Sequence, residues 1–165
     1  PTANLATQGV PKLLAERTAG VSLALGNDGA TAVKQDIFNQ MQLLKYATQA
    51  VYGTPIAEPI VLPLNEMFDM GTRNGARALG VEDELGTLEP GKKADIVLLD
   101  ISSAIYQPTR DLMKTVMMVG TAQDVSDVIV DGKVLIKDKV FTTLDEEAII
   151  QSGKEQMHKL LSRCI

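Results

Sequence analysis

Asp28 is the residue whose type and position are best suited to chemistry. It follows a short, mostly apolar run, residues 21–25, from which only Gly26 and Asn27 separate it. An apolar run between turn residues predicts a buried strand, although periodicity alone leaves a helix open. Helix-like segments on both sides favour a βα unit of a parallel sheet, in which the loop after the strand carries the chemistry. A carboxylate there suits a general base, whereas Asn27-Asp28-Gly29 is also ordinary turn material.

Asn4 is the second candidate for a functional side chain. It lies in the polar, turn-rich stretch 1–9 and is the residue there best suited to contact a ligand, although an asparagine in such a loop is more often structural. The chain has one cysteine, Cys164, and one histidine, His158. Neither an internal disulfide nor a cysteine metal cluster is therefore possible, and a lone histidine in a helical segment is typical of a surface residue.

Residues 86–93 imitate a phosphate-binding loop. Their sequence, Gly-Thr-Leu-Glu-Pro-Gly-Lys-Lys, nearly matches G-x-x-x-x-G-K-[ST], but Lys93 replaces the hydroxyl that holds magnesium. Pro90 removes an amide donor, Glu89 adds a negative charge, and a strand rather than a helix is expected next. We interpret the stretch as a turn, with Pro90 and Gly91 at the centre of a type II turn.

The composition is that of an ordinary globular domain. Of the 165 residues, 45% are hydrophobic and 22% are charged, and the formal net charge of −5 argues against a nucleic-acid partner. The apolar runs are too short to cross a membrane, and no secretory signal is present. A single cysteine is compatible with a reducing cytoplasm. Because the sequence starts at Pro1 without a methionine, we expect a trimmed or partial product.

The first half of the chain has mostly helical patterns. Residues 36–52 form the clearest predicted helix, with apolar residues at helical spacing and Asp36 as the N-cap, where an Asn should cap about as well. Shorter helices are expected over 9–18, 64–70 and 72–79, the last capped by Thr72, while the three prolines of 53–63 predict an extended loop.

After Gly80 the pattern changes to that of a sheet. Residues 94–100 predict a strand, and residues 128–136 predict a hairpin whose Asp-Gly pair suits a type I′ turn. Thr143-Leu144-Asp145-Glu146 matches a capping box that opens the last helix. One face of that helix carries Ile149, Met157, Leu160 and Cys164. The switch from helical periodicity to hairpin chemistry indicates a boundary near residues 80–92.

Together these stretches resemble the C-terminal part of the amidohydrolase superfamily, in particular its cytosine/adenosine deaminase-like and chlorohydrolase-like branch. The segments that carry the resemblance are Pro1-Thr2-Ala3-Asn4-Leu5, residues 20–29, 72–80 and 128–133, and, most specifically, residues 85–97. The resemblance implies an α/β fold. Residues 1–91 would be the C-terminal portion of a (β/α)8 TIM barrel, and residues 92–165 the C-terminal half of a flanking composite β-sandwich.

The resemblance also implies a site that this chain holds only in part. In that superfamily a divalent metal, zinc or iron, is held by histidines that would lie upstream of Pro1 and by an aspartate that Asp28 matches. Asp28 would contact the metal and shuttle the proton of its bound water, and Asn4 would line the substrate pocket. One carboxylate is not a metal site, so we expect no metal and no turnover in this chain alone. Asn27 departs from the usual Thr or Ser, which bears on substrate preference.

Two classes of function follow from the sequence. The first is the C-terminal fragment of a metal-dependent amidohydrolase, which hydrolyses a C–N bond or a similar leaving group of a cyclic or heteroaromatic small molecule. The alternative is a non-enzymatic domain that stands alone or complements a partner chain. In both cases we expect the chain to pack against its missing N-terminal part or a copy of itself, because an apolar strand left bare exposes unpaired backbone groups. The fragment is the favoured hypothesis.

Overall fold

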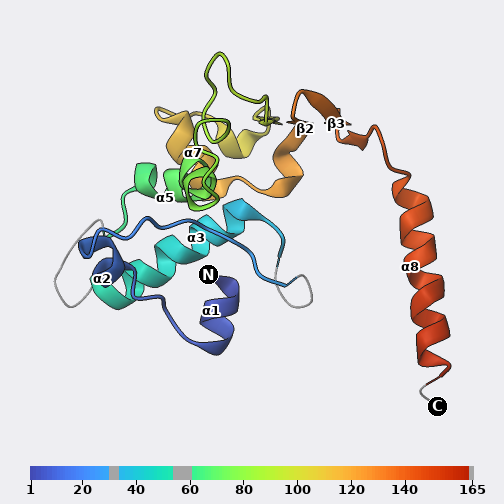
Figure 1. Cartoon of the computed structure of the whole chain (residues 1–165), viewed down its shortest axis with the longest axis horizontal. Helices are drawn as coiled ribbons and strands as arrows, with labels where there is room; N and C mark the ends of the chain where they lie inside the picture. Colours follow the sequence, from blue (N-terminus) through green and yellow to red (C-terminus); the bar gives the residue numbers. More distant parts are fainter. Residues whose placement is uncertain (30–33, 54–60, 164–165) are drawn as a thin grey trace.

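The computed structural model describes residues 1–29, 34–53 and 61–163. These residues form a helical body, a small sheet beside it, and a long C-terminal helix that stands apart from both (Figure 1). The helical elements before the sheet are α1 (Thr2–Thr7), α2 (Leu13–Thr18), α3 (Ile37–Thr48), the π-helical turn η1 (Gln49–Gly53), α5 (Leu64–Gly71) and α6 (Arg73–Ala78). The remaining elements are β1 (Ile96–Leu99), η2 (Ala104–Tyr106), α7 (Leu112–Val119), η3 (Ala122–Asp124), β2 (Val125–Val130), β3 (Lys133–Lys137), β4 (Val140–Phe141) and α8 (Glu146–Leu161).

Helix α3 lies at the centre of the helical body, between α1 on one side and α5 and α7 on the other (Figure 1). It confirms the helix predicted over 36–52, whose last residues form η1. Its buried face carries Gln40, Met41, Leu44 and Thr48, which recur at helical spacing. Met41 and Leu44 join a buried cluster that also contains Leu13, Leu62, Met67, Met70 and Met117. Methionine is unbranched and flexible, so it fills the irregular gaps between the packed helices of this core.

Asp36 caps α3, as the sequence predicts, and also links two distant parts of the chain. Its Oδ1 accepts hydrogen bonds from the Phe38 and Asn39 backbone N–H groups, at 2.9 and 3.3 Å. Its Oδ2 accepts a hydrogen bond from the backbone N–H of Ala122 in η3, at 3.2 Å. Because of this second contact, Asp36→Asn should lower the free energy of unfolding noticeably. A side-chain amide has only one acceptor oxygen and cannot replace both carboxylate oxygens.

The predicted strand over residues 21–25 is wrong for this structure, which assigns neither helix nor strand to residues 21–29. A strand is defined by its ladder to a neighbour, and no described strand lies alongside this segment. Two hydrogen bonds hold it instead. The Leu25 N–H donates to the Met70 carbonyl at 2.8 Å, and the Asn74 side-chain amide donates to the Leu23 carbonyl at 3.0 Å. Leu23 and Leu25 pack against the core cluster, while Val21 is exposed.

Three local expectations in the first half also change. The stretch 1–9, expected to be turn-rich, contains α1, and the helix expected over 9–18 begins only at Leu13. Thr72 precedes α6 but does not cap it, because its hydroxyl donates to the Phe68 carbonyl of α5 instead. The predicted loop over 53–63 falls largely outside the described residues.

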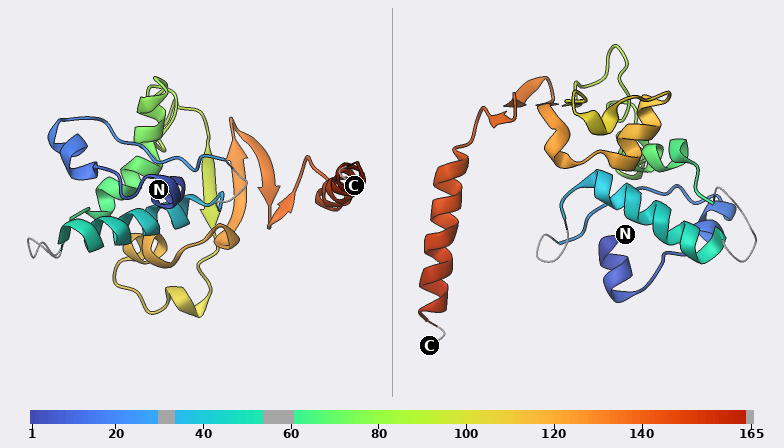
Figure 2. Two further views of the ribbon diagram at one scale, coloured as in Figure 1. Left: turned by 90° about the horizontal axis from the view of Figure 1, so that it is seen from below. Right: turned by 180° about the vertical axis from the view of Figure 1, so that it is seen from behind.

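The sheet in the second half is antiparallel, in the order β1-β2-β3-β4, and lies beside the helical body (Figure 2). It confirms the strand predicted over 94–100 and the hairpin over 128–136. Asp131 and Gly132 both have positive φ, at 50° and 75°, as a type I′ turn requires. The only sheet among the described residues is therefore antiparallel, and the parallel barrel portion expected for residues 1–91 is not directly visible.

Helix α8 confirms the predicted C-terminal helix, but the predicted cap is two residues early. Asp145, not Thr143, is the N-cap, and its carboxylate accepts a hydrogen bond from the Ala148 N–H at 3.0 Å. A capping box does occur elsewhere, where Thr121 and Asp124 cap η3 reciprocally. Within the described part of the chain, no helix is both long and apolar enough to span a bilayer.

Tyr106 is the largest fully buried side chain of the second half. Its burial, and after that the neighbouring Asp124 carboxylate, raises the pKa of Tyr106 to about 12. The phenol is therefore neutral near pH 7, and Tyr106 acts there as a packing residue rather than as an acid.

We predict that the two contacts of Asp36 are separable by substitution. Asp36→Asn should lower the free energy of unfolding by about 1 kcal/mol, because the cap survives but the Ala122 N–H loses its acceptor. Asp36→Ala should cost about 2 kcal/mol, because the cap is lost as well. The matched control is Asp111→Asn, since Asp111 caps α7 through the Lys114 N–H alone. Urea unfolding measures all three variants, and equal costs for the two Asn variants would contradict the second contact.

Candidate functional site

Asn4 and Asp28, the two residues that the sequence singles out, line one pocket. The pocket has a volume of about 120 Å³, and its walls come from α1 and from the loop after residues 21–25. The lining residues are Pro1, Ala3, Asn4, Thr7, Gln8, Gly26, Asn27 and Asp28. The tertiary structure thus brings together two side chains that are 24 positions apart in the sequence.

Asp28 presents an accessible carboxylate at the mouth of this pocket. The residue is exposed, and its backbone has a φ of +67°, in the left-handed region that Asp tolerates better than most residues. Its Oδ1 accepts a hydrogen bond from the Gly29 N–H at 2.8 Å. Among the described residues the carboxylate accepts no other hydrogen bond, so Oδ2 is open to a ligand or to a proton.

Asn4 is held by its own helix. Its side-chain amide donates to Gln8 Oε1 at 3.2 Å, one helical turn along α1. That contact occupies a donor of Asn4 and leaves its side-chain oxygen for a ligand. Asn4 therefore has both a structural role and a free acceptor that lines the pocket.

Gln40 fixes α1 against α3 and is a residue that the sequence analysis missed. Its side chain is fully buried, and it accepts a hydrogen bond from the Thr2 N–H at 2.9 Å while donating to Thr2 Oγ1 at 2.8 Å. A buried glutamine with both ends of its amide satisfied sets the position of its partner. In the sequence, the one available signal is a polar residue on the otherwise apolar face of a predicted helix.

Asn27 also lines the pocket and carries an unsatisfied buried acceptor. Its Oδ1 is buried and has no hydrogen-bond partner among the described residues. Such an acceptor costs about 1–3 kcal/mol when it is left unpaired, so native proteins rarely keep one without a donor nearby. Asn4 and Asp28 together give the pocket two acceptors, which suits a ligand that carries N–H or O–H groups.

Asn74 and α5 determine where the loop with Asn27 and Asp28 begins. The two hydrogen bonds to Leu23 and Leu25 lie at alternate residues of the segment and therefore hold the same edge of it. The sequence analysis assigned Asn74 no such role, because a side-chain donor 51 residues away leaves no local pattern.

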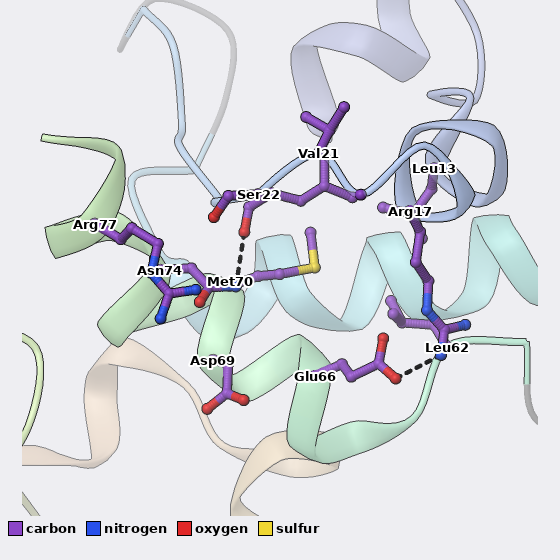
Figure 3. Close-up of a pocket in the computed structure, with 12 residues that line it drawn as sticks. Leu13, Arg17, Val21, Ser22, Leu62, Glu66, Asp69, Met70, Asn74 and Arg77 are labelled. Atoms are coloured by element: carbon purple, nitrogen blue, oxygen red, sulfur yellow. Dashed lines mark hydrogen bonds and ion pairs between the residues drawn. The ribbon is translucent and has the colours of Figure 1, made fainter.

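A larger pocket, of about 290 Å³, lies beside residues 20–23, ahead of the loop that carries Asp28 (Figure 3). Arg17 of α2 forms an ion pair with Glu66 of α5 across it, at 2.6 Å. Asp69 also lines the pocket, but it is paired with Arg73. The two ion pairs therefore tie α2 to α5 and α5 to α6, while Arg77, which also lines the pocket, forms no ion pair among the described residues.

Lys92 and Lys93, in the segment 86–93 that resembles a phosphate-binding loop, form contacts within the protein. Lys92 Nζ donates to the Glu82 carbonyl and to Thr87 Oγ1, at 2.9 and 2.7 Å, and Lys93 forms an ion pair with Glu84 at 2.6 Å. The Lys92 N–H bonds to the Glu89 carbonyl, and Gly91 has a φ of +95°. This confirms the predicted type II turn.

On their own, the described residues do not fit a metal ion. No group of three or more His, Cys, Asp or Glu side chains gathers anywhere in the described ranges. The Asp28 carboxylate could supply one ligand, but zinc sites take three or four protein ligands.

Comparison with known proteins identifies the family. Residues 4–135 match the model of the amidohydrolase family, and the chain belongs to that family. It is 36% identical over 161 residues to a 5-methylthioadenosine/S-adenosylhomocysteine deaminase of Moorella thermoacetica, covering 96% of this chain and 37% of the relative. It is 30% identical over 159 residues to an S-triazine hydrolase of Gordonia rubripertincta, covering 93% of this chain and 32% of the relative.

The fold agrees with this assignment. The crystal structure of an adenosine deaminase from Xanthomonas campestris with bound zinc superposes with a TM-score of 0.82 at 26% identity, over 91% of this chain and 34% of that one. The resemblance to deaminase-like and chlorohydrolase-like amidohydrolases is thereby confirmed. The chain spans about a third of the length of the relatives it matches.

We predict that Asn74→Ala loosens the segment before Asp28. The Leu23 carbonyl would lose its donor, which should lower the local stability by about 1 kcal/mol. Exchange of the Leu25 amide hydrogen should then be about five-fold faster. Arg73→Ala, on the same helix, removes only an exposed ion pair and should leave that amide unchanged. Equal exchange rates in the two variants would show that Asn74 does not hold the segment.

Proposed function

We propose that this chain is the C-terminal part of a metal-dependent hydrolase that cleaves a C–N bond, or a similar leaving group, on a cyclic or heteroaromatic small molecule. The observation that carries the proposal is that Asn4, Asn27 and Asp28 line one pocket, the smaller of the two described above, in a chain of the amidohydrolase family. The relatives named above act on an adenine-containing nucleoside and on a triazine, and both compounds contain a nitrogen-rich aromatic ring. The acceptor oxygens of Asn4 and Asp28 in the pocket suit the N–H groups of such substrates.

Asp28 is the proposed general base of this site. Its Oδ1 is held by the Gly29 N–H, which fixes the orientation of the carboxylate, and its Oδ2 is free to take a proton from the attacking water. Asn4 would orient the substrate by accepting one of its hydrogen bonds. In the whole enzyme a divalent metal, zinc or iron, would lower the pKa of that water. Asp28 would be its one ligand from this chain, with the histidines supplied by the missing part.

We further propose two structural units for the chain. Residues 1–91 would complete a (β/α)8 barrel, in which residues 21–25 become a strand once neighbours are present. Residues 92–165 would form half of a β-sandwich with its C-terminal helix. The support for the second unit is a row of apolar residues that runs through paired positions of all four strands: Val97, Val128, Ile136 and Phe141. A sheet with such a face requires a second layer to cover it.

The proposed partners are a small-molecule substrate and either the missing N-terminal part or a copy of this chain, in the cytoplasm, with no nucleic acid and no membrane. One observation favours the alternative of a non-enzymatic, partner-complementing domain: the described residues supply a single candidate ligand and no metal cluster. An upstream coding region with a His-x-His pair would decide for the enzyme.

The central prediction concerns Asp28 in the complete protein. Asp28→Asn removes the basic oxygen and keeps the size, so turnover should fall by about 10²- to 10⁴-fold. The matched control is Asp131→Asn. Asp131 also has a positive φ, at +50°, but it lies in the β2–β3 turn, and an Asn is well accepted in a type I′ turn. Steady-state kinetics on an aminated or chlorinated triazine and on adenosine measure both variants, and a normal rate for Asp28→Asn would end the assignment.

For the 165-residue chain alone we predict no stoichiometric metal and no turnover, because a single carboxylate binds zinc or iron weakly. Elemental analysis after incubation with zinc or iron, followed by the same assays, measures this. One metal ion per chain together with turnover would refute the fragment hypothesis and show that these residues make a complete site.

A further inference from the structure

Gln40 and Thr48 are fully buried polar residues of α3. The Thr48 hydroxyl forms its hydrogen bonds within its own helix, to the Leu44 and Lys45 carbonyls. The Gln40 side chain instead bonds to two segments outside α3. Burying a side-chain amide is unfavourable unless its hydrogen bonds are satisfied, so an apolar residue would fill this place in the core more favourably. The particular role of Gln40 must therefore lie in the hydrogen bonds that it makes.

The first of the two segments is α1, which lies beside α3 and carries Asn4 (Figure 1). Its N-cap residue is Pro1, and no side chain of α1 caps it. Gln40 supplies this cap from α3, because its Oε1 accepts the Thr2 N–H at 2.9 Å and its Nε2 donates to Thr2 Oγ1 at 2.8 Å. A helix of six residues without a buried residue is marginal on its own. The position of Asn4 therefore depends on Gln40.

The second segment is the stretch that leads into α3. The Gln40 Nε2 also donates to the Lys34 carbonyl, at 3.4 Å, so that both of its N–H groups are used. Lys34 follows Asp28 by six positions, and this bond anchors the chain shortly after Asp28. One side-chain amide thus contacts the helix that carries Asn4 and the chain beyond Asp28.

We propose that Gln40 is a positioning residue of the pocket that Asn4 and Asp28 line. Its amide joins the two walls of that pocket and sets the spacing between the Asn4 oxygen and the Asp28 carboxylate. Neither Gln40 nor Thr2 lines the pocket itself, so Gln40 acts through the residues that it holds. This inference rests on the proposed function, because it takes the pocket as the site of the reaction.

The spacing matters because the two walls have different roles in the proposed reaction. Asn4 accepts a hydrogen bond from the substrate before and during the reaction, so its displacement weakens binding and raises KM. Asp28 takes a proton only during the reaction, so its displacement lowers kcat. A displacement of about 1 Å can slow an enzyme about a hundred-fold. Kinetics can therefore distinguish a variant that frees one wall from a variant that frees both.

The test uses the complete polypeptide that carries these residues, with adenosine and an aminated or chlorinated triazine as substrates. Gln40→Met keeps the length of the side chain but removes its hydrogen bonds to both walls, so KM should rise and kcat should fall, each about ten-fold. Thr2→Val removes only the hydroxyl on α1, so KM should rise about three-fold and kcat should change by less than about two-fold. Thr2→Ser keeps the hydroxyl and should restore KM.

The matched control is Gln42→Met, on the same helix. Gln42 lies about 200° around α3 from Gln40, and its Nε2 donates to the Gly120 carbonyl at 2.9 Å. This substitution should leave KM and kcat unchanged. Hydrogen exchange of the α1 amides should be faster in Gln40→Met and unchanged in Gln42→Met. If Gln40→Met does not fold, the comparison of Thr2→Val with Thr2→Ser decides the proposal.

Faster exchange in α1 with unchanged KM and kcat would overturn the proposal, because Gln40 would then hold the helix without positioning the site. Equal effects of Gln40→Met and Gln42→Met, or of Thr2→Val and Thr2→Ser, would overturn it as well. An unsubstituted protein that turns over none of these compounds would overturn the proposed function and this inference together. Turnover that is insensitive to Gln40 would overturn this inference alone.

Discussion

The burial of one face of α3 is the interaction on which the rest of the structure depends. Met41 and Leu44 place this helix in the methionine-rich core, and Leu23 and Leu25 pack against the same cluster. Polar groups on and beside α3 then fix its neighbours: Gln40 holds α1, and Asp36 and Gln42 hold the segment around Gly120 and Ala122. Gly120 must be a glycine there, because a Cβ would lie 2.4 Å from the Val116 carbonyl oxygen. Both walls of the candidate site are therefore positioned, directly or through the core, by this one helix.

The candidate site is built from acceptors. Asp28 has an open carboxylate oxygen, Asn27 has a buried oxygen without a donor, and Asn4 has an oxygen left free by its contact with Gln8. The unpaired Asn27 acceptor costs about 1–3 kcal/mol of stability for as long as no donor reaches it.

Several apolar side chains, like the acceptors of the pocket, lack a partner among the described residues. Exposed apolar side chains occur in different parts of the fold: Val21 in the segment before Asp28, Val97 and Phe141 on the two edge strands of the sheet, and Ile149 and Met157 in α8. A chain that spans about a third of its relatives' length would be expected to show such surfaces wherever the remaining protein packs. The proposal that the chain is part of a longer enzyme accounts both for the lack of a metal-ligand cluster among the described residues and for the exposed apolar side chains.

The sequence by itself determined the features that depend on neighbours within a few residues. The cap at Asp36, the type I′ turn at Asp131 and Gly132, and the turn that disguises residues 86–93 as a phosphate loop all follow from local backbone preferences. Sequence motifs also identified the family, and they singled out Asn4 and Asp28, two of the polar side chains that line the pocket. Only the tertiary structure decided that residues 21–25 form no strand, that Gln40 and Asn74 are positioning residues, and that Asn27 is unpaired. Each of these depends on partners 38 or more residues away, or on the lack of one, and no local periodicity records them.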